Sequence, residues 1–297
     1  MIKNVAIVGP KSNEDVWNIP ISFCNHFNKL GYNVKFYNTL INDKFDDTNL
    51  VNLIHEYKTN VFKPDLILHL DFGLFASKYL VKSNIPTAIW VVESGDDPQN
   101  FRLNYSKYKN KGFDLILSPD IRCVREYELN GMKAAWCPHF ADPDQFIVEQ
   151  EPIYDCVTTR SVEEPFFKTL KQKLQNRFVP RISGFFHGLE HSIHLKKGKI
   201  VIQNSKYKEI TRRVFEGMMA NRLVLTDRPS DGAEMNRIFE ENKHIVYFNG
   251  IDECIEKVNF YCSNESERIR ISNNGYLKVQ KFHTTTARIQ QILKLFV

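Results

Sequence analysis

Residues 212–228 of the chain, RRVFEGMMANRLVLTDR, combine a helical pattern with a short aliphatic run. In the first half, apolar residues recur at helical spacing, as at Val214 and Met218, which predicts a helix over residues 209–220. The aliphatic run LVLT at 223–226 is typical of a short buried strand. A helix that leads through a two-residue turn into a buried strand is the repeating unit of an α/β protein.

The same alternation of strands and helices extends along the rest of the chain. The strands are nearly continuous aliphatic runs, as expected for parallel sheets that helices cover on both faces. They are expected at residues 4–9, 32–38, 65–70, 87–92, 113–118, 133–137, 154–159, 177–183, 199–203, 223–226 and 244–248. Helices are expected at 16–30, 50–58, 74–82, 100–109, 122–129, 164–174, 209–220 and 234–241, with three more toward the C-terminus. The pattern predicts two doubly wound, Rossmann-like domains.

The alternation pauses at residues 138–155, PHFADPDQFIVEQEPIYD, which combine Pro and acidic residues with little periodicity. This pause predicts a linker between an N-terminal domain, residues 1–140, and a C-terminal domain, residues 151–282. Two such sheets facing each other form a cleft lined by the carboxyl ends of their strands, where this architecture places its ligands. Functional residues are therefore expected in the strand-to-helix loops.

The composition indicates a soluble, cytoplasmic protein. Hydrophobic residues make up 42% of the chain, and the net charge of +5 permits an anionic ligand without the clustered basic footprint of a dedicated DNA-binding protein. The six cysteines are dispersed and form no CxxC pair, as in a reducing compartment. No segment reaches the roughly 20 apolar residues of a membrane span. The lack of an export signal argues against a periplasmic receptor, and the single glycine of VAIVGPKSNED, residues 5–15, argues against a dinucleotide oxidoreductase.

Glu216 stands in the apolar middle of the predicted helix, four residues after Arg212. Side chains at this spacing meet, so one interpretation is a surface ion pair worth about 0.3 kcal/mol. The other interpretation is that Glu216 binds a ligand. The residues around it favour the second interpretation.

The run FEGMMANRLVLT at 215–226 resembles the nucleotide-sugar signature of GT-B glycosyltransferases, in which small residues, a tight turn and a buried strand follow a helix glutamate. It is most similar to the CgeB-like and spore-protein glycosyltransferase group, which has a C-terminal domain like that of glycosyltransferase family 4. That group has an arginine three residues before the glutamate, as Arg213 is here. Further similar segments follow in the group's order, at 85–101, 113–120, 127–146, 234–261 and 267–293.

The resemblance implies a GT-B fold, a nucleotide-sugar donor such as a UDP-sugar, and a C-terminal helix, residues 283–297, that returns to the N-terminal domain. It gives Glu216 the role of receiving the ribose hydroxyls of the donor. Asn221 replaces the usual turn glycine, and asparagine also tolerates the left-handed conformation that the turn requires. Many retaining members have a second glutamate eight residues earlier, where this chain has Lys208. The resemblance favours a retaining enzyme, and Lys208 leaves the inverting alternative open.

Glycosyl transfer produces an oxocarbenium-like centre and a departing diphosphate, so the site must stabilise negative charge. GT-B sites use cationic side chains and helix N-termini for this purpose, and neither a metal nor another cofactor is expected. The DPD sequence at 142–144 mimics a metal-binding DxD, but its place in the linker argues against a metal. Besides Glu216 and Arg213, the donor-binding candidates lie in loops after strands: Arg160, Asn204, Lys206, Ser230 and Gly232. Ser230 has an alternative role as a helix cap.

The acceptor side needs a group that manages the acceptor proton. Candidates are the acids that follow the strand at 87–92 and a histidine in the linker: Glu93, Asp96, Asp97 and His139. Solvated loop acids and structural histidines are the alternative interpretation of these residues.

The sequence therefore predicts a cytoplasmic, NDP-sugar-dependent glycosyltransferase. Its acceptor is a glycan, a protein, a small molecule or a modified DNA base, although no run of interleaved basic and aromatic residues suits a nucleic-acid strand. The alternative is a catalytically degenerate protein that binds a nucleotide sugar or a glycan. Lys208 is compatible with that alternative.

Overall fold

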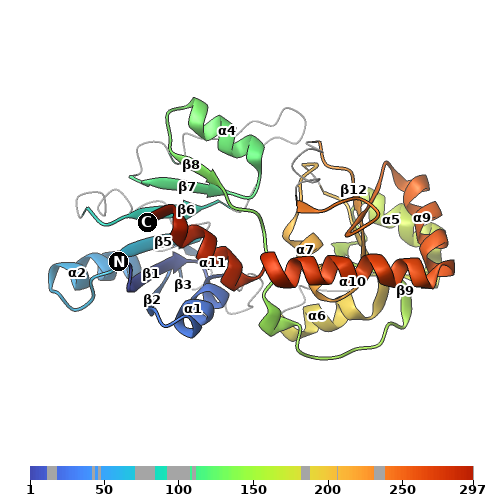
Figure 1. Ribbon diagram of the computed structural model, residues 1–297, viewed down its shortest axis with the longest axis horizontal. Helices are drawn as coiled ribbons and strands as arrows, with labels where there is room; N and C mark the ends of the chain where they lie inside the picture. The colour runs from blue at the N-terminus through green and yellow to red at the C-terminus, as the bar shows by residue number, and fades with distance from the viewer. Residues whose placement is uncertain are drawn as a thin grey trace. The chain divides into compact units, whose positions relative to one another are not determined.

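The structure of the protein is a computed structural model (Figure 1). It describes residues 1–11, 19–41, 44–45, 48–70, 84–91, 108, 112–181, 188–205, 207–230 and 238–296. The chain divides into two compact units. The first unit comprises Met1–Pro138 and Thr285–Val297, and the second unit comprises His139–Thr284. Within the described ranges, no helix combines the length and the apolar character needed to cross a bilayer.

The first unit is built on a sheet of six strands, all parallel to their neighbours, as the continuous aliphatic runs predict. The strand order is β2-β1-β5-β6-β7-β8. The strands are β1 (Asn4–Gly9), β2 (Asn33–Asn38), β5 (Leu66–Leu70), β6 (Thr87–Trp90), β7 (Leu115–Ser118) and β8 (Ala134–Trp136). The order reverses beside β1, because the chain first moves out to β2 and then crosses back to β5.

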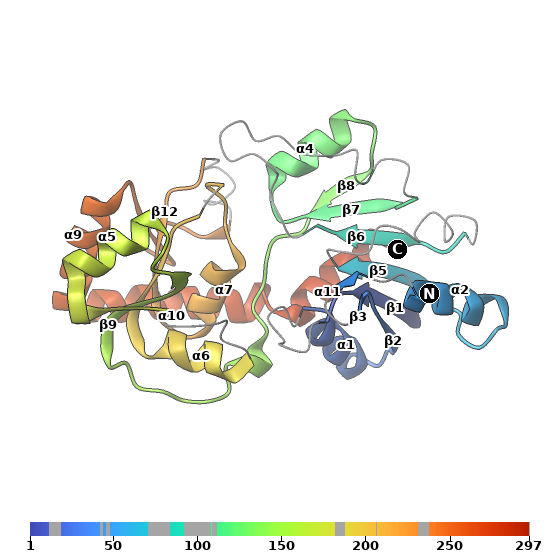
Figure 2. The ribbon, with the colours of Figure 1, turned by 180° about the vertical axis from the view of Figure 1, so that it is seen from behind.

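Helices from both ends of the chain cover this sheet. They are α1 (Ile19–Lys29), α2 (Thr48–Lys58), α4 (Ile121–Leu129) and α11 (Thr285–Leu293), which continues into the short helix η5 (Lys294–Phe296). α11 packs against α1 (Figures 1 and 2), where the Ser22 and Thr285 hydroxyls share a buried hydrogen bond of 2.9 Å. A small hairpin of β3 (Leu40–Ile41) and β4 (Lys44–Phe45) was not predicted.

The second unit contains a five-stranded, fully parallel sheet of order β10-β9-β11-β12-β13. Its strands are β9 (Tyr154–Ser161), β10 (Phe178–Arg181), β11 (Gly198–Gln203), β12 (Leu223–Asp227) and β13 (Val246–Phe248). The order reverses between β9 and β11, and ligands of such sheets bind outside the carboxyl ends of the strands at this point.

Two groups of helices pack on this sheet. α5 (Pro165–Leu174) and α9 (Ile251–Ser263) join the core cluster on the face that includes Ile200 and Leu223. α7 (Arg212–Met219) contacts both α6 (Gly188–Lys196) and α10 (Glu265–Phe282), as Figure 1 shows. Short helices η3 (Pro143–Gln145) and η4 (Gln175–Arg177) complete the unit.

α7 packs closely on the sheet, and the turn after it has the geometry that the sequence predicts. A Cβ atom added to Gly217 would lie 2.9 Å from the Val224 side chain and 3.1 Å from that of Val201, so only glycine lets the helix approach β11 and β12 this closely. Asn221 has φ 55°, the left-handed conformation expected of the residue that replaces the turn glycine.

Four predicted helices differ from the structure or lie wholly or mostly outside the described residues. α7 begins at Arg212, three residues later than expected, because residues 209–211 belong to the preceding loop. The predicted helix at 234–241 does not reach its expected end, since Phe239 and Glu240 are not helical and Glu241 forms an isolated bridge with Ile245. The predicted helix at 74–82 lies outside the described residues, as does all of 100–109 except residue 108.

Candidate functional site

The carboxyl edge of the second unit's sheet gathers several of the predicted donor-site residues. Arg160 lies near the end of β9, Asn204 follows β11 directly, and Ser230 follows β12. α7 begins at the same edge, because a helix that follows a parallel strand starts where the strand ends. One edge of one sheet therefore brings together loops that are far apart in sequence.

Glu216 is the most unusual charge at this edge. The residue is 7% exposed, and each of its two carboxylate oxygens has one partner. Oε1 lies 2.8 Å from Nε of Arg212, and Oε2 lies 3.0 Å from Nε2 of His191. Burial on its own would raise the pKa of Glu216, but the charges of His191, Arg212 and Arg213 and the His191 hydrogen bond lower it to about 2. Glu216 is therefore a carboxylate throughout the physiological range.

The ion pair between Arg212 and Glu216 exists, but it is not the surface pair of the first interpretation. The exposed fractions of the two side chains are only 11% and 9%. The Arg212 guanidinium also lies over the Phe140 ring, 5.4 Å from its centroid. A buried pair that loses one partner leaves an uncompensated charge, at a cost of about 3–5 kcal/mol. This pair is therefore a fixed part of the interior of the second unit.

Sequence reasoning missed His191 because it missed α6. The side chains that α6 buries include Ser192, His194 and Lys196, so the helix lacks the apolar stripe by which an amphipathic helix is recognised. Each is held by a polar contact; Lys196, for example, donates to the carbonyl oxygens of Phe146 and Val148. The only signal in the sequence was a glycine followed by two histidines three residues apart.

The loop between β11 and α7 is tied to the end of β12. Asp227 accepts a hydrogen bond of 2.7 Å from the Ser205 backbone, and its other carboxylate oxygen lies 3.0 Å from Nζ of Lys208. Lys208 itself has φ 54°, and its carbonyl accepts a hydrogen bond from the Ser230 backbone. Burial raises the pKa of Asp227, and the contacts with Ser205 and Lys208 oppose that shift without cancelling it. Lys208, at the position of the second glutamate, is thus paired with a buried acid.

Buried polar atoms without a hydrogen-bond partner mark the same edge. Among the residues that the structure describes, the Thr159 and Thr211 hydroxyls and the Gln203 side-chain nitrogen have no partner. The last residue pair of the β9–β11 register is Val157 with Val201, and Thr159 and Gln203 lie beyond it toward the carboxyl ends of their strands. Buried polar groups without partners are costly, so these three are available to the polar atoms of a ligand or to water.

The other predicted residues have diverse surroundings. Arg160 forms an ion pair with Glu164, with an N–O distance of 2.7 Å. The His139 side chain is buried, with 4% exposed. Its ring centroid lies 6.5 Å from that of Phe215, the residue that precedes Glu216. Predicted residues that lie outside the described residues are Glu93, Asp96, Asp97, Lys206 and Gly232.

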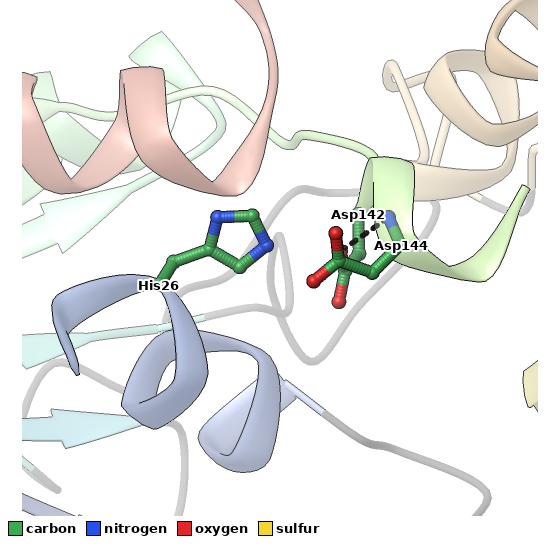
Figure 3. Close-up of side chains that lie close together, drawn as sticks. All are labelled: His26, Asp142 and Asp144. Atoms are coloured by element: carbon green, nitrogen blue, oxygen red, sulfur yellow. Dashed lines mark hydrogen bonds between the residues drawn. The ribbon is translucent and has the colours of Figure 1, made fainter. Parts of the chain in front are cut away.

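The DPD sequence forms a capped turn. Asp142 is the N-cap of η3, and its carboxylate accepts a hydrogen bond of 3.0 Å from the Asp144 backbone (Figure 3). Capping of this kind satisfies a backbone N–H that a helix start leaves without a partner.

Comparison with known proteins adds a family match and a whole-chain fold. A family model described as "Glycosyl transferase-like" matches residues 166–294, a little under half of the chain. No curated protein sequence matches. Among solved structures, sucrose-phosphate synthase from Thermosynechococcus elongatus superposes with a TM-score of 0.67 at 10% identity, covering 99% of this chain and 98% of that one.

Two further structures are similar over their full lengths. The Anabaena protein HepE in complex with UDP-glucose gives a TM-score of 0.64 at 10% identity, with 99% of both chains covered. A glycosyltransferase from Rickettsia africae gives 0.63 at 13% identity, with 99% of this chain and 98% of that chain covered. The chain has the GT-B fold. Two parallel sheets flanked by helices, as described above, are what GT-B requires, and the fold predicted from the sequence is confirmed.

Proposed function

We propose that the protein is a glycosyltransferase that takes its sugar from a nucleoside diphosphate sugar, in particular a UDP-sugar. The GT-B fold and the glycosyl transferase-like match over residues 166–294 support this proposal. HepE, which has the same fold, binds UDP-glucose. The CgeB-like group remains our proposal for the subgroup, on the residues around Glu216.

The observation that carries the proposal is the state of the Glu216 carboxylate. An ionised carboxylate accepts hydrogen bonds at both oxygens and donates none, and each oxygen has two lone pairs. His191 occupies one site on Oε2, at 3.0 Å, whereas Nε of Arg212 lies 2.8 Å from Oε1 as an ion pair outside hydrogen-bond geometry. At least one acceptor site therefore remains on each oxygen. The two adjacent hydroxyls of a ribose match this pair of acceptors.

The groups around Glu216 suit the diphosphate of the same donor. The N-terminus of α7 concentrates backbone N–H groups and partial positive charge. Arg213 adds a cation in its first turn, and the N-cap residue, Thr211, makes no capping hydrogen bond with its side chain. We therefore place the diphosphate at this helix end, with Arg160, Asn204, Lys206, Ser230 and Gly232 as the further donor-site candidates.

On the acceptor side, we retain Glu93, Asp96, Asp97 and His139 as candidates for managing the acceptor proton. Retention of anomeric configuration follows the resemblance to the CgeB-like group. The proposed acceptors are a glycan, a protein, a small molecule or a modified DNA base.

A second candidate function is binding of a nucleotide sugar without transfer. The pairing of Lys208 with buried Asp227 favours this second function. The residue at the position of the second glutamate is then a lysine, and its charge is held in an internal ion pair. Both candidates predict binding of the donor. Only an enzyme activates the bond between the sugar and the diphosphate.

The test combines binding with turnover. UDP and a panel of UDP-sugars are titrated calorimetrically into the wild-type protein and into Glu216→Gln, and radiolabelled UDP-sugars are followed for slow hydrolysis. We expect binding by the wild type, a loss of about tenfold or more in Glu216→Gln, and hydrolysis that Glu216→Gln reduces. The matched control is Glu267→Gln, which removes an exposed carboxylate paired with Arg270. Binding without hydrolysis would favour the second candidate, and no binding of any nucleotide would contradict both.

A further inference from the structure

His191 stands on a different helix from the carboxylate that it contacts. It is on α6, whereas Glu216 and Arg212 are on α7, and the two helices pack together. The exposed fraction of the His191 side chain is 16%, so the contact with Glu216 is largely shielded from water. His191, Arg212 and Arg213 lower the pKa of Glu216 by their charge; the two arginines are on α7, and His191 is on α6.

The chemistry of the pair defines which ring nitrogen carries a proton. Glu216 is ionised and only accepts, so Nε2 of His191 must be the donor across the 3.0 Å contact. A neutral His191 ring is therefore the Nε2–H tautomer, and a charged ring keeps the same donor. Its neighbour on α6, His194, is engaged elsewhere, with Nε2 2.9 Å from the Thr158 carbonyl oxygen.

Arg212 alone would leave the carboxylate free to turn. A terminal carboxylate has a broad torsional minimum, and a single contact at Oε1 restrains only one of its oxygens. The second contact, from His191 to Oε2, fixes the plane of the group and so the directions of its two unused acceptor sites. Preorganised acceptors cost a ligand less ordering on binding.

We infer that His191 is a positioning residue, which holds the Glu216 carboxylate in the orientation that receives two adjacent hydroxyls of a nucleoside. The inference deepens the proposed function and rests on it. In this role His191 acts on the nucleotide through Glu216, which occupies its Nε2. On this inference α6 contributes, through His191, to the affinity of the site for the nucleotide, although Glu216 is on α7.

The test uses three variants of the full chain with UDP as the probe. His191→Leu removes the donor, His191→Gln keeps an N–H donor on a side chain of similar reach, and His55→Leu, on an exposed part of α2, is the control. We expect His191→Leu to weaken UDP binding by about tenfold, His191→Gln to restore it to within about threefold, and His55→Leu to leave it unchanged. In a Glu216→Gln background, His191→Leu should weaken UDP binding much less.

Two outcomes separate this inference from the proposed function. If wild-type protein binds UDP and Glu216→Gln weakens binding, but His191→Leu does not, the positioning role is refuted and the function stands. If the wild type binds no UDP, the positioning role and the proposed function are both contradicted. Should His191→Leu fail to fold, the decision rests on His191→Gln and on the ¹⁵N NMR spectrum of the wild-type ring. A neutral ring protonated on Nδ1 instead of Nε2 would overturn the inference.

Discussion

The charged Glu216 side chain is tolerated in the interior of the second unit because Arg212 and His191 lie against its carboxylate. Burial disfavours the ionised form, while Arg212 and His191 favour it more strongly, so the pKa falls from 4.5 to about 2. Such shifts are typical of carboxylates that bind ligands or hold structural networks. What distinguishes Glu216 is its ion pair with Arg212, the first residue of α7, because this helix begins at the carboxyl edge of the sheet, where ligands of such folds bind.

This depressed pKa makes a prediction about acid stability. The folded state binds the Glu216 proton less tightly than the unfolded chain, so the stabilisation is complete above about pH 4.5 and is lost as the pH falls toward 2. A shift of this size corresponds to about 3 kcal/mol. Urea unfolding of the wild type and Glu216→Gln at pH 7 and pH 3 should show a stability difference that shrinks markedly at the lower pH. An equal difference at both pH values would contradict the assignment.

The pair of Lys208 and Asp227 leads to a stability prediction with the opposite pH dependence. Burial raises the pKa of Asp227, so the folded state holds this proton more tightly than the unfolded chain and the cost of ionisation grows as the pH rises. Lys208→Met removes the cation 3.0 Å away and should raise that pKa further. We expect destabilisation on the order of 1 kcal/mol at pH 7, decreasing toward pH 4.5. Lys243→Met, which breaks the exposed pair with Glu240, is the control and should change stability little at either pH.

At the level of single elements, α7 depends on close contact with the sheet. Gly217→Ala would place a methyl group 2.9 Å from Val224 and 3.1 Å from Val201, and the packed interior must shift to accept it. The change should lower the free energy of unfolding by about 1–3 kcal/mol, although alanine is the better helix former. Ser266→Ala, on the exposed side of α10, is the comparison and should be neutral or slightly stabilising. Denaturant unfolding measures the free energy of unfolding of both variants. A Gly217→Ala protein as stable as the wild type would mean that α7 does not pack against β11 and β12 as described.

The elements that the sequence predicted well are those in which burial and hydrophobicity coincide. β1 and β5 consist of aliphatic runs that are buried on both faces, and their predicted ranges agree with the structure to within a residue. α6 was missed for the opposite reason, since it buries His194 and Lys196 by satisfying their polar groups locally. Periodicity detects apolar burial only.

The candidate site was predictable only in part, for a similar reason. The i, i+4 spacing indicates that Arg212 meets Glu216, but whether the pair is buried depends on what packs over the helix. The contact of Lys208 with Asp227 links residues 19 positions apart through the sheet. Contacts of that kind follow from strand order and register, which local patterns do not specify.

At the scale of the whole molecule, the GT-B fold joins two parallel sheets in one chain. The second unit is continuous in sequence, whereas the first unit is completed by α11 from the far end of the chain. The match to glycosyl transferase-like proteins covers most of the second unit, which also holds Glu216, His191 and the buried, unpartnered polar atoms of Thr159, Gln203 and Thr211. The proposed donor site is therefore built within one unit and can be tested by its binding properties alone.

The most direct test measures whether Glu216 and the ribose hydroxyls interact. Calorimetric Kd values are determined for UDP and for 2′-deoxy-UDP with the wild-type protein and with Glu216→Gln. The wild type should bind UDP about tenfold or more tightly than the deoxy form, whereas Glu216→Gln should discriminate between them much less, because the hydroxyl and the carboxylate depend on each other. Equal discrimination by both proteins would show that the ribose binds elsewhere, and it would contradict the assignment of Glu216.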